Sequence, residues 1–151
     1  MPRSPLLFIL ADGGRARLVR RAPEGRHYVT VEEVDHTDRL RALRRELRAT
    51  PPVRVFSSHD ARRSAAGPED LLTPAKEAFM REVAERAVAQ GGSEPGSVFL
   101  VASPRLRTVL QRSLDGRVRI VGTLGKNLTK VPDHALGDWL DEAARTSQLR
   151  S

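Results

Sequence analysis

The sequence predicts an α/β domain built on a mixed five-stranded sheet that helices cover on both faces. Its 151 residues contain no cysteine, so a hydrophobic core must hold the fold without disulfides. Three short apolar segments separated by turn residues come first, which is typical of an antiparallel meander. Helical periodicity then alternates with two further short apolar segments, which is typical of β-α-β units. We expect one domain over residues 1–151.

The expected meander begins at residue 6. Residues 6–11 are an uninterrupted apolar run that ends at Asp12 and two glycines, which predicts a strand buried on both faces and then a tight turn. Residues 16–20 follow as the second strand. After a Pro-Glu-Gly turn, residues 27–34 alternate well enough for a third. Connections this short join antiparallel neighbours.

A basic helix is expected next. Thr37 is a suitable N-cap, and leucines at 40, 43 and 47 recur at helical spacing while arginines cover the other faces. Those arginines are Arg39, Arg41, Arg44, Arg45 and Arg48. Two prolines end the helix, and residues 53–56 read as a short extended piece. Residues 57–72 hold too few apolar side chains for anything but a loop, and a loop of this length is usually functional or disordered.

The second half of the chain begins with a helix. Thr73 is followed by a proline at the first helical position, and the pattern continues to Gln90, where two glycines stop it. Its apolar face contains Phe79, Val83 and Ala87. Residues 97–102 then form a buried strand.

Two helices and one strand complete the pattern. Pro104 opens a short helix, and residues 117–123 are the fifth strand. The last helix is expected to start near Pro132. Its apolar side carries Leu136, Trp139, Leu140 and Ala143.

No segment is suited to cross a membrane or to direct secretion. The longest apolar run has six residues, whereas a spanning helix needs about 20. Only Arg3 provides a basic region before that run, and an aspartate and two glycines follow it in place of a cleavage site. We therefore expect a cytoplasmic location.

The charge of the chain is strongly positive. The formal net charge is +7, and 23 of the 26 basic side chains are arginines. Guanidinium groups stay charged and bind phosphate through two parallel hydrogen bonds, so a basic face is suited to nucleic acid. A solvated basic surface without a partner is the alternative, because net charge alone identifies no ligand.

None of the catalytic motifs is complete. Asp12 ends the first strand, where a ribonuclease H-like nuclease holds a metal ligand, but the later strands end without further acids; Asp12 as a turn residue is the alternative. The segment from Gly122 to Lys126 lacks the P-loop spacing, which leaves a structural turn or a weak anion-binding nest. The four histidines lack metal-ligand spacing. We expect no catalytic residue, no metal and no cofactor.

Residues 56–68 are the most distinctive stretch of the sequence. They are basic and rich in small and hydroxyl side chains, so they suit contact with a phosphate backbone, in which arginines anchor and serines donate hydrogen bonds. The chain has only six aromatic residues, and most of them fall in apolar patterns. Base stacking is therefore not expected to contribute much.

Several segments together resemble the bacterial family of host-attachment proteins, in the order in which the family has them. They are residues 8–18, with an Ala-Asp turn and an Ala-Arg strand; the loop residues Arg54, Phe56, Ser58, Arg62 and Arg63; residues 79–84; residues 98–104; and residues 125–134, with Gly-Lys-Asn-Leu-Thr. Three positions depart from the family pattern, namely Val53, Ser64 and Asn127.

The resemblance implies a fold and a range of functions. The family is related to the middle domain of archaeal and eukaryotic class-1 release factors and of Pelota-type rescue factors, so a ribonuclease H-like fold and a link to translation are implied. Release factors use a Gly-Gly-Gln loop, and this chain has none. Peptidyl-tRNA hydrolysis by that route is therefore not expected.

These observations lead to one leading hypothesis, a non-enzymatic binding module that contacts ribosomal or other structured RNA and acts indirectly in attachment. Its expected nucleic-acid contacts are Arg54, Ser58, Arg62, Arg63, Lys126 and Lys130, supported by the arginine helix. One alternative is an enzyme acting on a phosphorylated or nucleotide substrate in a pocket formed by Asp12, Arg17, Gly125 and Asn127. Another is an adhesion-pathway protein that acts through a protein partner. The sequence does not define the oligomeric state.

Overall fold

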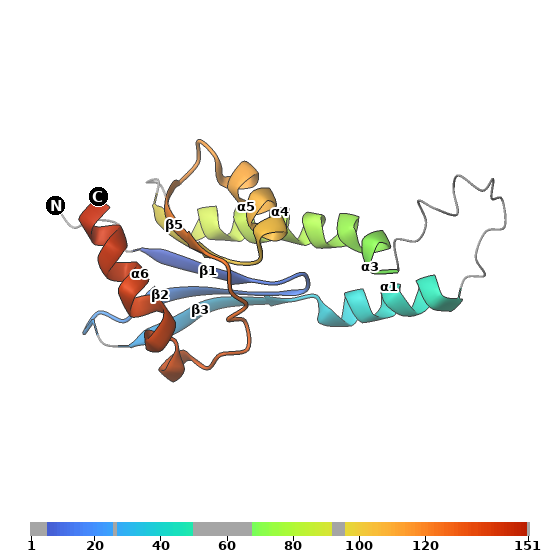
Figure 1. Ribbon diagram of the computed structural model, residues 1–151, viewed down its shortest axis with the longest axis horizontal. Helices are drawn as coiled ribbons and strands as arrows, with labels where there is room; N and C mark the ends of the chain where they lie inside the picture. The colour runs from blue at the N-terminus through green and yellow to red at the C-terminus, as the bar shows by residue number, and fades with distance from the viewer. Residues whose placement is uncertain (1–5, 26, 50–67, 92–95, 151) are drawn as a thin grey trace.

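A five-stranded mixed sheet forms the centre of the fold (Figure 1). The computed structural model describes residues 6–25, 27–49, 68–91 and 96–150. The strand order is β3-β2-β1-β4-β5. The strands are β1 (Leu7–Ala11), β2 (Arg15–Arg21), β3 (Tyr28–Asp35), β4 (Ser97–Val101) and β5 (Arg119–Leu124). The expected α/β class and the mixed five-stranded sheet are therefore confirmed.

The strand directions bring four chain segments to one edge of the sheet. β1 and β2 pair antiparallel, as do β2 and β3, whereas β4 runs parallel to both β1 and β5. β1, β3, β4 and β5 therefore point the same way. The segments that follow them, which include Asp12, His36, Ser103 and Gly125, all leave from the same edge.

The alternation of β1 divides the core between two helical layers. Leu7 and Ile9 pack with α4 (Thr73–Gln90) and α5 (Pro104–Leu114) on one face. Phe8 and Leu10 pack with α6 (Gly137–Arg150) on the other. Every residue of β1 is buried, which explains why its sequence is a continuous apolar run. Helices on both faces were expected.

The end of the expected loop and the start of the last helix differ from the prediction. A short helix, α3 (Pro68–Leu71), lies within the expected loop, because Leu72 directly after it is fully buried and anchors the chain. The last segment forms a 3-10 turn, η1 (Asp133–Ala135), before α6 begins at Gly137. Trp139 was expected on the apolar side but is 42 % exposed. The expected extended piece at 53–56 lies outside the described residues.

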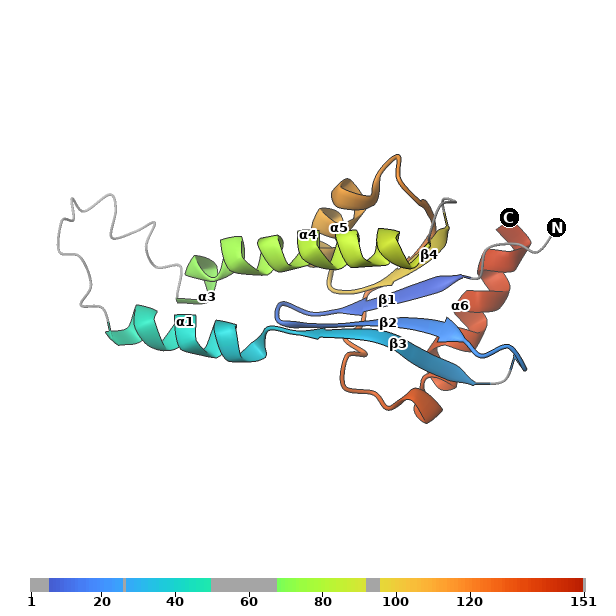
Figure 2. The same ribbon diagram turned by 180° about the vertical axis from the view of Figure 1, so that it is seen from behind.

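Helix α1 (Thr37–Ala49) and the first half of α4 project together beyond the sheet as a two-helix arm (Figures 1 and 2). The start of α1 is held by Asp35, whose Oδ1 accepts the backbone amide of Thr37 at 2.8 Å. None of the 13 residues of α1 is fully buried, although its three leucines are half-buried. The arm therefore has large surfaces outside the main core. Among the described residues no helix is long and apolar enough to cross a membrane.

Candidate functional site

Asp12 lies at the sheet edge and is fully engaged in hydrogen bonds. Its Oδ1 accepts the backbone amides of Gly14 at 2.9 Å and Arg15 at 2.8 Å, which fixes the tight turn after β1. Its Oδ2 lies 2.9 Å from the hydroxyl of Thr129, 117 residues further along the chain. Asp12 therefore both shapes the turn and holds the segment after β5.

Asn127 is joined to Asp12 through the same threonine. Its Oδ1 accepts the Thr129 amide at 3.1 Å and lies 2.7 Å from the Thr129 hydroxyl. That hydroxyl has one proton, so the two acceptors share it. The structure thus brings together two of the four residues expected to form a pocket, with Thr129 between them.

Arg17, the third of these residues, is buried beneath the segment that follows β5. Its side chain is only 7 % exposed. Its guanidinium donates to the backbone carbonyls of Leu128 at 3.1 Å and Thr129 at 3.3 Å and also to that of Val131. It forms an ion pair with Asp133 as well. A buried guanidinium with this many acceptors fastens the segment to the sheet.

Thr30 on β3 completes this partly buried cluster. Its amide donates to Asp133 Oδ2 at 3.1 Å, and its hydroxyl donates to Oδ1 of the same carboxylate at 2.6 Å. Burial alone would raise the pKa of Asp133, but hydrogen bonds from Thr30 and Arg17 outweigh it, so the pKa lies below its ordinary value. Asp133 is therefore held as a carboxylate.

The two lysines expected to contact nucleic acid are exposed at the same sheet edge. The ammonium of Lys126 lies 5.5 Å from the ring centre of Trp139, so a cation–π contact holds it against α6. Lys130 and the neighbouring Gly125 are exposed. The other four residues expected at this interface, Arg54, Ser58, Arg62 and Arg63, lie outside the described residues.

The outward face of α1 carries the strongest concentration of arginine in the described chain. Arg41, Arg45 and Arg48 are exposed and recur at positions i, i+4 and i+7, so they form one stripe along two helical turns. Arg41 also makes an ion pair with Asp38 at 3.3 Å, and both partners are highly exposed. An exposed pair of this kind contributes little stability and opens readily for another anion.

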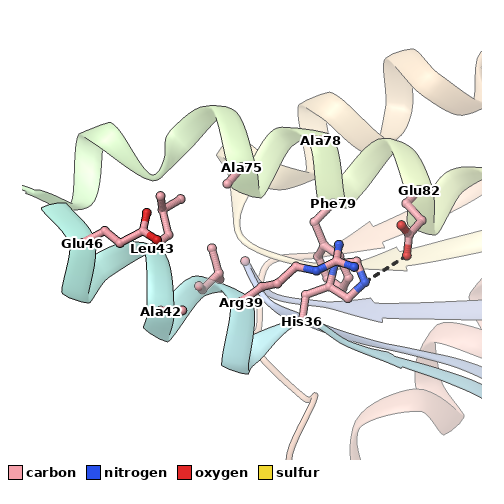
Figure 3. A pocket seen from close by; sticks show the side chains of 11 residues that line it. His36, Arg39, Ala42, Leu43, Glu46, Ala75, Ala78, Phe79 and Glu82 are labelled. Carbon is pink, nitrogen blue, oxygen red and sulfur yellow. Dashed lines mark ion pairs between the residues drawn. The ribbon is translucent and has the colours of Figure 1, made fainter.

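The inward face of α1 borders a groove of about 440 Å³ against α4 (Figure 3). Apolar side chains and helix surfaces form most of its walls, and charged groups lie at its ends. At the inner end, the His36 ring packs on Phe79 with 4.7 Å between ring centres. The His36 Nε2 lies 3.2 Å from a Glu82 oxygen. We refer to this feature as the arm groove.

The arm groove was not predicted from the sequence. His36 and Glu82 are 46 positions apart and belong to different elements, so no local spacing indicates that they meet. The apolar spacing of α1 indicated only that the helix has an inward face. Within the described ranges, no group of three or more histidine, aspartate or glutamate side chains is placed to hold a metal ion.

Comparison with protein families gives a match over most of the chain. A family model described as "Protein required for attachment to host cells" matches residues 7–140, which is most of the chain. The matched range includes the Arg17 cluster, the arm and the arm groove. Among curated proteins, none matches the chain.

Proposed function

The chain belongs to the family of proteins required for attachment to host cells, and within that host-attachment-related role we propose that it is a non-enzymatic module that binds structured RNA through the outward face of α1. The observation that carries the proposal is the exposed stripe of Arg41, Arg45 and Arg48 on a helix that projects from the sheet. Guanidinium groups at this spacing present a row of hydrogen-bond donors to which RNA phosphates can bind.

The position of the stripe supports RNA more than a passive basic surface. Several arginines elsewhere in the described chain are paired with acids, as in the pairs of Arg86 with Glu32 at 2.6 Å and Arg117 with Glu85 at 2.7 Å. Helix α1 instead carries five arginines against two carboxylates, and no core packing requires its exposed arginines. A projecting helix is also accessible to a large, curved partner such as folded RNA.

The remaining expected contacts belong to the same proposal. Lys126 and Lys130 would add phosphate contacts at the sheet edge, and Arg54, Ser58, Arg62 and Arg63 would add those of the segment between α1 and α3. The implied relationship to the middle domain of release factors, with a ribonuclease H-like fold and a ribosomal partner, is also part of it. The hydrogen bonds that occupy Asp12 and Asn127 favour a binding role over an enzymatic one.

The experiment compares RNA binding by two matched triple variants. In the first, Arg41, Arg45 and Arg48 are changed to glutamine; in the second, the exposed arginines Arg105, Arg112 and Arg145 on α5 and α6 are changed in the same way. Both variants lose three positive charges. The affinity for a fluorescent ribosomal RNA hairpin is measured by anisotropy from 50 to 300 mM KCl, and sedimentation with ribosomal subunits is followed at low and high salt.

The α1 variant should bind more weakly and depend less on salt. Each lost phosphate contact lowers the slope of log K against log salt concentration by about 0.7–0.9, so the slope should fall by about 2–3. At about 0.1 M salt this corresponds to a loss of affinity of roughly 100-fold or more. The α5/α6 variant should keep most of the affinity. Equal losses in the two variants, or no RNA binding by the unaltered chain, would exclude the proposal and direct attention to protein partners.

A further inference from the structure

The arm groove has the dimensions of a small-molecule site. Sites for small ligands usually have volumes of about 300–1,000 Å³ and are mainly apolar with a few polar groups. The groove, at about 440 Å³, falls within that range. If about 30 Å³ is assigned to each water-sized group, it has room for roughly 10–15 non-hydrogen atoms.

The walls of the groove are largely apolar and are incompletely covered by the residues that the structure describes. Leu40 lines the groove from α1. Figure 3 shows Leu43 of the same helix opposite Ala75 and Ala78 of α4. The alanines are one helical turn apart, and their short side chains leave space where larger ones would meet the leucines. Both leucines remain half-buried as a result. An apolar body in the groove would cover this surface, with Phe79 at its inner end.

The charged groups around the groove define the head group of the ligand. Glu82 is paired with a permanent cation, because its Oε2 lies 3.6 Å from Arg86 Nε, and the same oxygen lies 3.2 Å from His36 Nε2. Glu46 also has a partner. Arg39, in contrast, makes no ion pair with any residue in the described part of the chain, and its side chain extends along the groove toward His36 and Phe79 (Figure 3). The guanidinium of Arg39 is therefore available to pair with an anionic group of a ligand.

We propose that the arm groove binds a small carboxylic acid with an apolar body of about 8–12 carbons. The carboxylate pairs with Arg39, and the apolar body lies between the leucines of α1 and the alanines of α4. This site is separate from the outward arginine stripe, because residues 39, 40 and 43 face the groove whereas residues 41, 45 and 48 do not line it. The inference does not depend on RNA binding.

The test uses three probes that share one chain length. Decanoate, decanol and decylammonium are titrated into the full chain by calorimetry, each below its aggregation concentration. Decanoate should bind at one site per chain, and decylammonium at least tenfold more weakly, because it opposes Arg39. Equal affinity for the three probes, or no saturable binding of decanoate, would overturn the proposal.

Two substitutions with one matched control, together with one spectroscopic measurement, locate the site. Arg39→Gln should weaken decanoate about 10- to 100-fold and leave decanol unchanged, whereas the matched change Arg105→Gln should alter neither. Ala75→Phe should fill the groove and abolish binding of both probes. Decanoate should shift the NMR methyl signals of Leu40 and Leu43 but not those of Leu136 in the opposite core. Shifts at Leu136 in place of those of α1 would refute this location even if Ala75→Phe failed to fold.

Discussion

Replacing Arg17 with methionine tests whether the buried cluster is structural. The substitution keeps an apolar stem of similar length and removes the guanidinium. The carbonyls of Thr129 and Val131 then lose the guanidinium donor, the carbonyl of Leu128 keeps only the amide of Val131, and Asp133 loses its ion-pair partner. Because Leu128 and Thr129 are almost fully buried, water cannot replace the donor at their carbonyls without opening the packing.

The expected loss in the free energy of unfolding is about 3–5 kcal/mol. Leaving one buried polar group without a partner costs about 1–3 kcal/mol, and removing one member of a buried ion pair costs about 3–5 kcal/mol. These contributions overlap. The Asp133 side chain is 42 % exposed, so water solvates part of its charge after the change. The expected loss in the free energy of unfolding is therefore smaller than the sum of the separate contributions. For a chain of this size the melting temperature should fall by roughly 6–20 °C.

Urea unfolding followed by circular dichroism measures the effect. With a slope of roughly 2 kcal/mol/M, the midpoint should move down by about 1.5–2.5 M. Arg21→Met is the matched control, because Arg21 is exposed at the end of the same strand, and it should change stability by less than about 0.5 kcal/mol. A loss below about 1 kcal/mol for Arg17→Met would show that the guanidinium is not a structural fastener and would return Arg17 to the ligand-binding candidates.

Three further predictions concern the core and the pH dependence. Gly122→Ala should destabilise the protein by about 1–3 kcal/mol in urea unfolding, since an added Cβ would lie 2.5 Å from a ring carbon of Phe99; an unchanged midpoint would contradict this contact. Leu72→Ala should cost about 2–5 kcal/mol, because Leu72 is fully buried, whereas a loop residue in solvent would show almost no effect. The pKa of Asp133 is lowered in the folded state, so its stabilisation is complete above about pH 4 and is lost as the pH falls through the folded-state pKa. Asp133→Asn should therefore unfold more easily at pH 7 and depend less on pH between 5 and 2, and a pH dependence equal to that of the unaltered chain would refute the assignment.

The central sheet was predictable because its signals are local. The continuous apolar run of β1 reflects burial on both faces, and short turns require the antiparallel pairing of β1, β2 and β3. The placement of β4 beside β1 has no such signal, since it depends on packing across about 90 residues. The start of α6 was misplaced because Pro132 opens a 3-10 turn and not the α-helix itself.

The candidate site was less predictable because its contacts are long-range. Asp12, Arg17 and Asn127 were identified from the sequence, yet Asp12 and Arg17 find partners more than 110 residues away, and only Asn127 contacts a near neighbour, Thr129. Arg17 in particular lies between buried neighbours on β2. The sequence pattern does not indicate which backbone carbonyls accept hydrogen bonds from its guanidinium. The arm groove depends on the separation of α1 and α4, a distance that helical periodicity does not encode.

The buried contacts of Arg17 also determine when this part of the fold can form during synthesis. β2 emerges early, but the first carbonyl that accepts its guanidinium is 111 residues away. At about 5–20 residues per second, translation reaches that carbonyl roughly 5–20 s later. Until then the Arg17 guanidinium on the nascent meander remains in water. The face of the sheet that carries it is therefore not yet covered. Residues 128–150 therefore complete the second core late, and a chain that stopped before them would contain all five strands but only part of that core.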